Sequence, residues 1–179
     1  MQAIDITFRP AAPKDAKTLF DVKIAAYGDE FREFEYARQG YQDAVDDCNA
    51  KKPKSDGMFS RKWHKMFCSG QFGDRSLVIR DGQKIIGQIC SFPGEHFTSE
   101  YAAYDMSESV NVIFCIYVLP EYKNRGVGRM AMEYMERLHP ADKWILDTPE
   151  ISPKNKRFYE KCGYTQGKSG SLNVYAKGF

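Results

Sequence analysis

The chain has 179 residues, a net charge of +2 and 42% hydrophobic residues. This length suits one domain with its own core, so a single domain over residues 1–179 is expected, and the hydrophobic content excludes wholesale disorder. The near-neutral charge argues against a partner bound by bulk electrostatics, such as nucleic acid, and the longest apolar run, "VIFCIYVL", has the length of a strand rather than of a membrane span.

The N-terminus and the cysteines predict a cytoplasmic protein. "MQAIDITFRP" lacks the charged-then-apolar layout of a signal peptide. The cysteine count is odd and no CxxC occurs, so reduced thiols are expected rather than disulfides or a metal site. No metal and no membrane partner is predicted. The five cysteines are Cys48, Cys68, Cys90, Cys115 and Cys162.

The N-terminal part of the chain predicts a strand followed by helices. "IDITFRPA", residues 4–11, alternates apolar and polar residues, as a half-buried strand does. A helix opens at Pro13, with Asp15 in its first turn. "FSRKWHKMF", residues 59–67, predicts an amphipathic helix in which His64 is a surface or core residue. The apolar face of that helix is expected to carry Phe59, Trp63, Met66 and Phe67.

The rest of the chain alternates strands and helices. In residues 76–92, Asp81-Gly82 stands between two β-rich runs and predicts a hairpin with a two-residue type I′ turn. Residues 109–118, "SVNVIFCIYV", are apolar on both faces and predict a strand covered on both sides. Strands are also expected at "KWILDT", residues 143–148, and "SLNVYA", residues 171–176. This order predicts a mixed α/β fold around one sheet.

Residues 121–140, "EYKNRGVGRMAMEYMERLHP", combine a basic, glycine-containing turn with a helix that ends before Pro140. The free N–H groups of a helix start carry partial positive charge, and glycines let backbone donors approach a phosphate. The turn therefore predicts an anion site, and the alternative is a loop that needs glycine only for its shape. The apolar stripe of the helix is Ala131, Tyr134, Met135 and Leu138, and the added cations are Lys123, Arg125 and Arg129.

Two known phosphate motifs fit this turn poorly. A Walker loop is excluded because no Gly-Lys-Ser/Thr follows. Gly126, Gly128 and Ala131 satisfy the dinucleotide pattern G-x-G-x-x-A. In that fold, however, the first glycine follows its strand almost directly, whereas residues 119–125 lie between the strand and Gly126 here. In addition, too little chain remains after Asp147 to complete a doubly wound sheet.

"IYVLPEYKNRGVGRM" resembles the acyl-CoA signature of the GNAT N-acetyltransferase superfamily, Q/R-x-x-G-x-G/A, with Lys123 in place of the usual Gln or Arg. "FYEKCGY", residues 158–164, is similar to the second hallmark of that family. The resemblance implies an α/β (α+β) fold with a central mixed, mostly antiparallel sheet of about six to seven strands and about four flanking helices. It also implies acetyl-CoA as co-substrate.

The resemblance assigns the cofactor-binding residues by position. The pyrophosphate of coenzyme A is expected on the backbone amides of Asn124, Arg125, Gly126, Val127, Gly128 and Arg129. The pantetheine arm is expected to pair with the end of the preceding strand, at Ile116, Tyr117 and Val118. The family often has Asn seven positions before its catalytic tyrosine, where this chain has Ser152, so Asn155 or Ser152 remains the candidate contact.

Tyr159 is the candidate general acid. Ser152 and Pro153 predict a helix start and Gly163 its end, so Tyr159 is expected to point inward with Asn155, Phe158 and Cys162. A phenol with a reference pKa near ~10 can protonate a leaving thiolate of pKa about 8.5. The alternative is a tyrosine that serves only the core. Asp147, on the strand "KWILDT", is the first candidate base and Glu108 the second.

The acceptor is expected to be a primary amine, from a small molecule or a peptide. The resemblance implies that residues 27–70 shape its site. The acidic and aromatic side chains of this segment favour a cationic amine over a neutral one, unless they form a solvated helix face. The alternative function is a non-catalytic acyl-CoA sensor on the same fold, and a nucleotide oxidoreductase is the third candidate function. The sequence leaves open whether the protein forms a homodimer. The acidic and aromatic residues of this segment are Asp29, Glu30, Phe31, Glu33, Phe34, Glu35, Tyr36, Asp43, Asp46 and Asp47.

Overall fold

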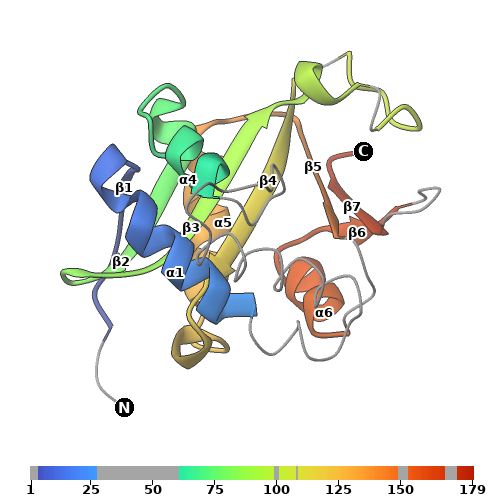
Figure 1. Cartoon of the computed structure of the whole chain (residues 1–179). Coiled ribbons are helices and arrows are strands. Elements are labelled where there is room, and N and C mark those ends of the chain that lie inside the picture. Colours follow the sequence, from blue (N-terminus) through green and yellow to red (C-terminus); the bar gives the residue numbers. More distant parts are fainter. Residues whose placement is uncertain (1–3, 28–60, 99–100, 108, 149–152, 168–172) are drawn as a thin grey trace. The chain divides into compact units, whose positions relative to one another are not determined.

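The computed structural model describes residues 4–27, 61–98, 101–107, 109–148, 153–167 and 173–179 (Figure 1). Its strands form one seven-stranded sheet in the order β1-β2-β3-β4-β5-β7-β6. The predicted mixed, mostly antiparallel sheet is confirmed. The strands are β1 (Ile6–Pro10), β2 (Ser76–Asp81), β3 (Lys84–Pro93), β4 (Val110–Val118), β5 (Lys143–Thr148), β6 (Thr165–Gln166) and β7 (Asn173–Lys177).

The helices of the described residues follow the predicted order. They are α1 (Ala16–Tyr27), α4 (Arg61–Phe67), α5 (Val127–Leu138) and α6 (Pro153–Lys161). A short 3-10 turn, Pro13–Asp15, leads into α1, and the Asp15 carboxylate accepts the Ala12 N–H at 2.8 Å and pairs with Arg9 at 2.6 Å. The hydrogen bond from Arg9 is the main cause of the lowered pKa of Asp15. The predicted helix start is therefore confirmed.

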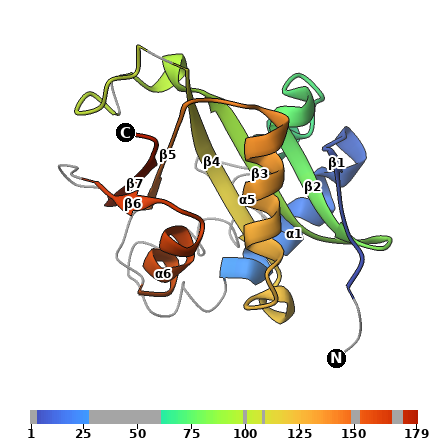
Figure 2. The same ribbon diagram turned by 180° about the vertical axis from the view of Figure 1, so that it is seen from behind.

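The chain divides into two compact units, one made of Met1–Gln88 with Tyr117–Val127 and the other of Ile89–Ile116 with Gly128–Phe179. In the first unit, Leu19 of α1 and Val78 of β2 are fully buried in one apolar cluster with Cys68. In the second unit, Val112 of β4 and Ile145 of β5 form the centre of another cluster. Figure 2 shows α5 along β3 and β4, where the Ser91 hydroxyl lies 3.1 Å from the Met135 sulfur.

The hairpin between β2 and β3 differs from its prediction. The two-residue turn is Gly82-Gln83, one residue later than expected, because Asp81 still belongs to β2. Only Gly82 has a left-handed φ there, 54°. A type I′ turn needs a positive φ at both central positions, so the predicted turn type is wrong, and glycine at the first position fits type II′.

Each of the two predicted apolar stripes includes one exposed residue, whereas Phe67 of α4 and Ala131 and Met135 of α5 are buried as expected. Helix α4 is only seven residues long. In it Met66 is 37% exposed, whereas His64 is 3% exposed and packs edge-on against Phe20, with ring centroids 5.4 Å apart. In α5, Leu138 is 37% exposed, and Met132 is fully buried instead. In both helices the neighbouring elements, which periodicity alone does not reveal, decide which side chain enters the core.

Candidate active site

The turn before α5 has a left-handed backbone at two positions. Asn124 has φ of 61°, the one positive φ at a non-glycine residue in the described part of the chain, and Gly126 has φ of 82°. Left-handed residues alternating with right-handed ones produce the concave backbone "nests" that bind anions. The turn then runs into the N-terminus of α5, whose first N–H groups lack helical acceptors. The backbone from Asn124 to α5 thus combines two left-handed residues with the N-terminus of a helix.

Glycine is needed at positions 126 and 128 of this turn for different structural reasons. A Cβ at Gly126 would meet no atom within 4 Å, so its left-handed φ is what favours glycine. A Cβ at Gly128 would lie 3.0 Å from Cε2 of Phe158, on α6. Gly128 thus permits close packing of α6 against the first turn of α5, a contact that the sequence analysis did not foresee.

The cations of the turn are held by neighbouring groups. Lys123 Nζ donates to the carbonyl of Ala26 at 2.8 Å, and Arg129 Nε donates to Glu133 at 2.7 Å. The Arg125 guanidinium lies 5.4 Å from the ring centroid of Tyr122. These contacts hold the three cationic side chains in place.

The linker before the turn is anchored to the β2–β3 hairpin. The Tyr122 hydroxyl donates to Asp81 at 2.9 Å, and Lys84 pairs with Glu121 at 3.0 Å. Asp81 also accepts the N–H of Asp5 at 2.8 Å. These two hydrogen bonds, the one from Asp5 first, hold the pKa of Asp81 below its ordinary value. The anchor limits the movement of the linker that leads into the turn.

The end of β4 presents its backbone rather than its aromatic side chain. Tyr117 is 5% exposed, and its hydroxyl donates to Gln88 at 2.7 Å. A Cβ at Gly87 would lie 2.2 Å from the Tyr117 carbonyl oxygen, so residue 87 has to be glycine for the two backbones to approach. Ile116 and Val118 are half-buried. Any ligand that contacts Tyr117 would therefore use its main chain.

The parallel pairing of β4 with β5 is short. It covers Val110↔Lys143, Asn111↔Trp144 and Val112↔Ile145, although β4 continues to Val118 and β5 to Thr148. The two strands lie together at one end and diverge towards the other in both views (Figures 1 and 2). On its other edge β5 pairs with β7, from Trp144↔Lys177 to Thr148↔Asn173.

Helix α6 turns Tyr159 into the interior, as predicted. Tyr159 is 9% exposed, and its ring centroid lies 5.0 Å from that of Tyr175 and 5.1 Å from that of Phe158. The helix ends in a Schellman motif at Gly163, which has φ of 88° and donates to Glu160, while Tyr164 donates to Tyr159. Asn155 is half-buried on the same helix.

Asp147 is exposed on β5, and the Tyr101 hydroxyl donates to its carboxylate at 3.0 Å. Tyr101 itself is 5% exposed, so its position is fixed by packing. Sequence analysis missed this pair, because 46 residues separate its members. The second candidate base, Glu108, and the alternative contact Ser152 lie outside the described residues, as do the acidic and aromatic residues of the expected acceptor segment.

Two buried groups and one half-buried group, Cys162, are unsuited to acid–base or nucleophilic chemistry near neutral pH. Burial, with Lys23 as a smaller cause, lowers the pKa of His64 to about 3. Burial raises the pKa of the Cys68 and Cys162 thiols to about 11. No disulfide joins the four described cysteines, and the raised pKa makes the Cys68 and Cys162 thiols poor nucleophiles.

The family model named "Acetyltransferase (GNAT) family" matches residues 34–164, well over half of the chain. The protein belongs to the GNAT acetyltransferase family. Members of this family are generally acetyltransferases. The left-handed turn at Asn124 and Gly126 and the inward-pointing Tyr159 lie within the matched residues. No curated protein sequence matches the chain.

Solved structures of other proteins share the GNAT fold. PH1933 from Pyrococcus horikoshii OT3 is 21% identical, with a TM-score of 0.66 over 97% of this chain and 98% of that one. The PaiA N-acetyltransferase from Thermoplasma acidophilum, solved with coenzyme A, is 15% identical, with a TM-score of 0.67 over 98% and 100%. The diaminobutyrate acetyltransferase EctA from Paenibacillus lautus is 9% identical, with a TM-score of 0.55 over 97% and 95%. At these identities the likeness shows the fold alone.

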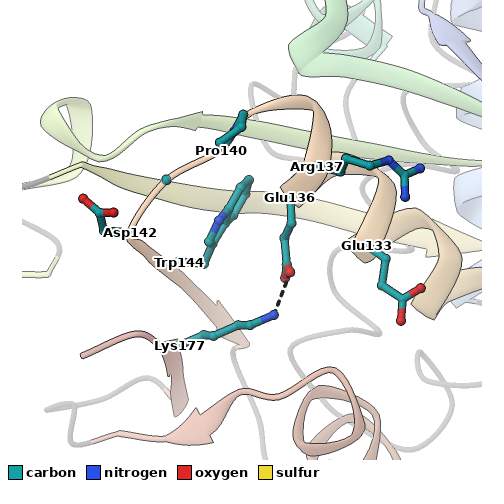
Figure 3. A pocket seen from close by; sticks show the side chains of 8 residues that line it. Glu133, Glu136, Arg137, Pro140, Asp142, Trp144 and Lys177 are labelled. Atoms are coloured by element: carbon teal, nitrogen blue, oxygen red, sulfur yellow. Dashed lines mark hydrogen bonds and ion pairs between the residues drawn. The ribbon is translucent and has the colours of Figure 1, made fainter.

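A surface pocket of about 420 Å³ lies at the C-terminal part of α5, apart from the residues assigned to the GNAT signature (Figure 3). Trp144 forms one wall, and the Lys177–Glu136 ion pair, 2.7 Å long, crosses it. Its lining mixes acidic and basic side chains, so its charge favours no ligand class. In the part of the chain that the structure describes, no helix has the length and apolarity to cross a membrane.

Proposed function

We propose that the protein transfers the acetyl group of acetyl-CoA to a primary amine by direct attack within a ternary complex. One observation carries the proposal. The matched GNAT domain contains a turn with left-handed residues at Asn124 and Gly126 that opens directly into the N-terminus of α5. Backbone N–H groups in this geometry suit a diphosphate, which coenzyme A carries.

The turn would bind the cofactor mainly through its backbone. Residues 124–129 supply the N–H groups, and Arg125 and Arg129 add positive charge. The end of β4, at Ile116, Tyr117 and Val118, would pair with the amides of the pantetheine arm. This assignment is supported by the short β4–β5 ladder, which ends at Val112↔Ile145, and by the buried Tyr117 side chain. Asn155 would add a side-chain contact from α6.

The chemistry requires a neutral amine, a stabilised oxyanion and a proton for the leaving thiolate. The ammonium group of the acceptor first gives a proton to Asp147, directly or through water, and Asp147 passes it to solvent. The neutral nitrogen then attacks the thioester carbon, and the proton that the nitrogen loses on attack follows the same path. Backbone N–H groups at the end of β4 stabilise the oxyanion. When the C–S bond breaks, the Tyr159 hydroxyl protonates the sulfur. The burial of Tyr159 supports the last step, because a rigid acid needs no rearrangement before transfer.

An amine acceptor fits what is known of related folds. The Paenibacillus lautus EctA structure was solved with L-2,4-diaminobutyric acid, an amine, and coenzyme A. For this chain we propose a cationic primary amine from a small molecule or a peptide. The Tyr101–Asp147 pair supports a positive charge on the acceptor, because an exposed carboxylate attracts an ammonium group.

The test is thiol release from acetyl-CoA with a broad panel of amines, for the wild type and for Tyr159→Phe. The proposal predicts turnover by the wild type and a kcat at least about 100-fold lower in the variant, with unchanged coenzyme A affinity. Binding of coenzyme A without turnover of any amine would instead indicate a non-catalytic acyl-CoA sensor. Equal kcat values would remove Tyr159 from the mechanism.

A further inference from the structure

The point where β4 and β5 separate is flanked by an aromatic side chain and a carboxylate on one face of the sheet. Val112 and Ile145 form the last parallel pair and belong to the same apolar cluster, so they share a face. Side chains alternate along a strand, so the next residues on that face are Phe114 on β4 and Asp147 on β5. These two residues therefore border the place where the ladder ends.

Phe114 is one of three phenylalanines that form an aromatic triad: Phe92, Phe97 and Phe114. The ring centroid of Phe114 lies 5.5 Å from that of Phe92 and 6.1 Å from that of Phe97, and the Phe92 and Phe97 centroids are 6.3 Å apart. All three rings are half-buried, whereas Val112 next to them is 1% exposed. The triad thus keeps part of its apolar surface in contact with solvent.

Tyr101 connects the triad to the carboxylate. Its ring centroid lies 6.4 Å from that of Phe97, and its hydroxyl donates to Asp147 at 3.0 Å. Because Tyr101 is 5% exposed and packed in the cluster of Val112 and Ile145, its hydroxyl is a fixed donor. The hydrogen bond orients the Asp147 carboxylate and leaves it exposed to an incoming cation.

We propose that the aromatic triad and Asp147 form the acceptor-binding surface, and that it selects a primary amine with a single ammonium group on an apolar body. This inference rests on the proposed function, because the thioester would lie along the end of β4. The ammonium group would pair with Asp147, and the apolar body would lie against the phenyl rings. Rings that face a cation stabilise it further through their quadrupoles.

The apolar and charged groups of this surface favour an amine with one ammonium group over a polyamine. This cluster of described residues has four aromatic rings and one carboxylate: Phe92, Phe97, Tyr101, Phe114 and Asp147. A second or third ammonium group would lie against apolar surface and lose hydration without an acidic partner. An apolar body of about one aromatic ring instead buries its own surface there.

Turnover of matched amines by the wild type and by Phe97→Ala tests the triad. Phenethylamine carries one charge and an aromatic body, ethylamine has the charge without the ring, and spermidine is a polycation. The inference predicts that kcat/KM for phenethylamine exceeds that for ethylamine and spermidine by at least about tenfold. Phe97→Ala should lower the phenethylamine value about tenfold and leave the ethylamine value within about twofold.

The matched control is Phe179→Ala, which removes an exposed ring that contacts Tyr104 and Lys143. It should change none of the three values by more than about twofold, and coenzyme A affinity should stay constant in both variants. Equal losses for phenethylamine and ethylamine in Phe97→Ala, or spermidine as the best substrate, would overturn the inference while the proposed function stands. Absence of turnover with every amine would overturn the proposed function itself.

Asp147→Asn tests the charge. The KM of this variant for phenethylamine should be about tenfold higher than that of the wild type and should not depend on salt, because the ion pair between Asp147 and the ammonium group is lost. Aniline is uncharged at neutral pH, so its KM should stay within about twofold even where kcat falls from loss of the base. An unchanged KM for phenethylamine would contradict a carboxylate that binds the ammonium group.

Discussion

Gly128 at the start of α5 and Phe158 on α6 are in direct contact: a Cβ on residue 128 would lie 3.0 Å from Phe158 Cε2 and 3.1 Å from Cζ. Tyr159, the proposed acid, follows Phe158 directly. The contact therefore links the start of the helix proposed to hold the pyrophosphate to the helix that carries the acid.

Gly128→Ala should disturb catalysis more than folding. The added methyl group pushes on Phe158, so we expect a loss of about 1 kcal/mol in the free energy of unfolding and a kcat about tenfold lower. Urea unfolding and thiol release measure the two effects. Phe158→Leu in the same chain makes room, so the double variant should lose less than the sum of the single variants.

Gly126→Ala is the matched control for this pair. Its methyl group meets no atom within 4 Å, but the φ of 82° strains a residue with a Cβ by about 1 kcal/mol. Phe158→Leu should therefore leave the effect of Gly126→Ala unchanged. If it rescued both glycine variants equally, the contact between residues 128 and 158 would not be the cause.

The anchor between Asp81 and Tyr122 predicts a dependence of stability on pH. Hydrogen bonds from Asp5 and Tyr122 lower the pKa of Asp81 from 3.8, so their stabilising effect is present above that value and is lost as pH falls through the lowered pKa. Asp81→Asn should be less stable than the wild type near neutral pH, and the difference should shrink at acid pH. Urea unfolding over a pH series measures it, and a constant difference would contradict the anchor.

His64 predicts a second dependence of stability on pH, with the same sign. Its pKa is about 3 in the folded state and about 6.5 when unfolded, so the unfolded chain binds more protons between these values. The wild type should lose about 2 kcal/mol between about pH 6.5 and about pH 5 from this group. No hydrogen-bond partner of either ring nitrogen lies among the described residues, so His64→Leu should fold.

The measurement is the slope of unfolding free energy against pH for the wild type and His64→Leu. The variant should be flatter below pH 6.5 by the amount that His64 contributes. Identical slopes in the two proteins would mean that His64 has the same pKa in the folded and the unfolded protein. That result would contradict the burial of His64 in the structure.

Features set by local sequence were predicted well. Gly163 ends α6 as expected, and "KWILDT" forms β5 with the predicted bounds, because caps and short apolar runs act over a few residues. The exposure of Met66 was missed, and the burial of His64 was left open as one of two alternatives, because a short helix can bury any of several faces and its neighbours decide which.

Contacts between distant segments could not be predicted from the sequence. The signature turn and Tyr159 could be assigned because their motifs are contiguous. The Tyr101–Asp147 hydrogen bond and the aromatic triad join separate elements, and no spacing rule brings such residues together. The residues of the proposed acceptor surface are consequently brought together only in the structure.

The central claim is that the backbone turn at residues 124–129 holds the pyrophosphate of coenzyme A. Calorimetric titration of the wild type with coenzyme A and with pantetheine, which lacks the pyrophosphate and the nucleotide, tests it most directly. We predict that coenzyme A binds at least about 100-fold more tightly than pantetheine, and that this difference in affinity is smaller in Gly126→Ala. No heat with coenzyme A, or equal affinities for the two ligands, would contradict the claim.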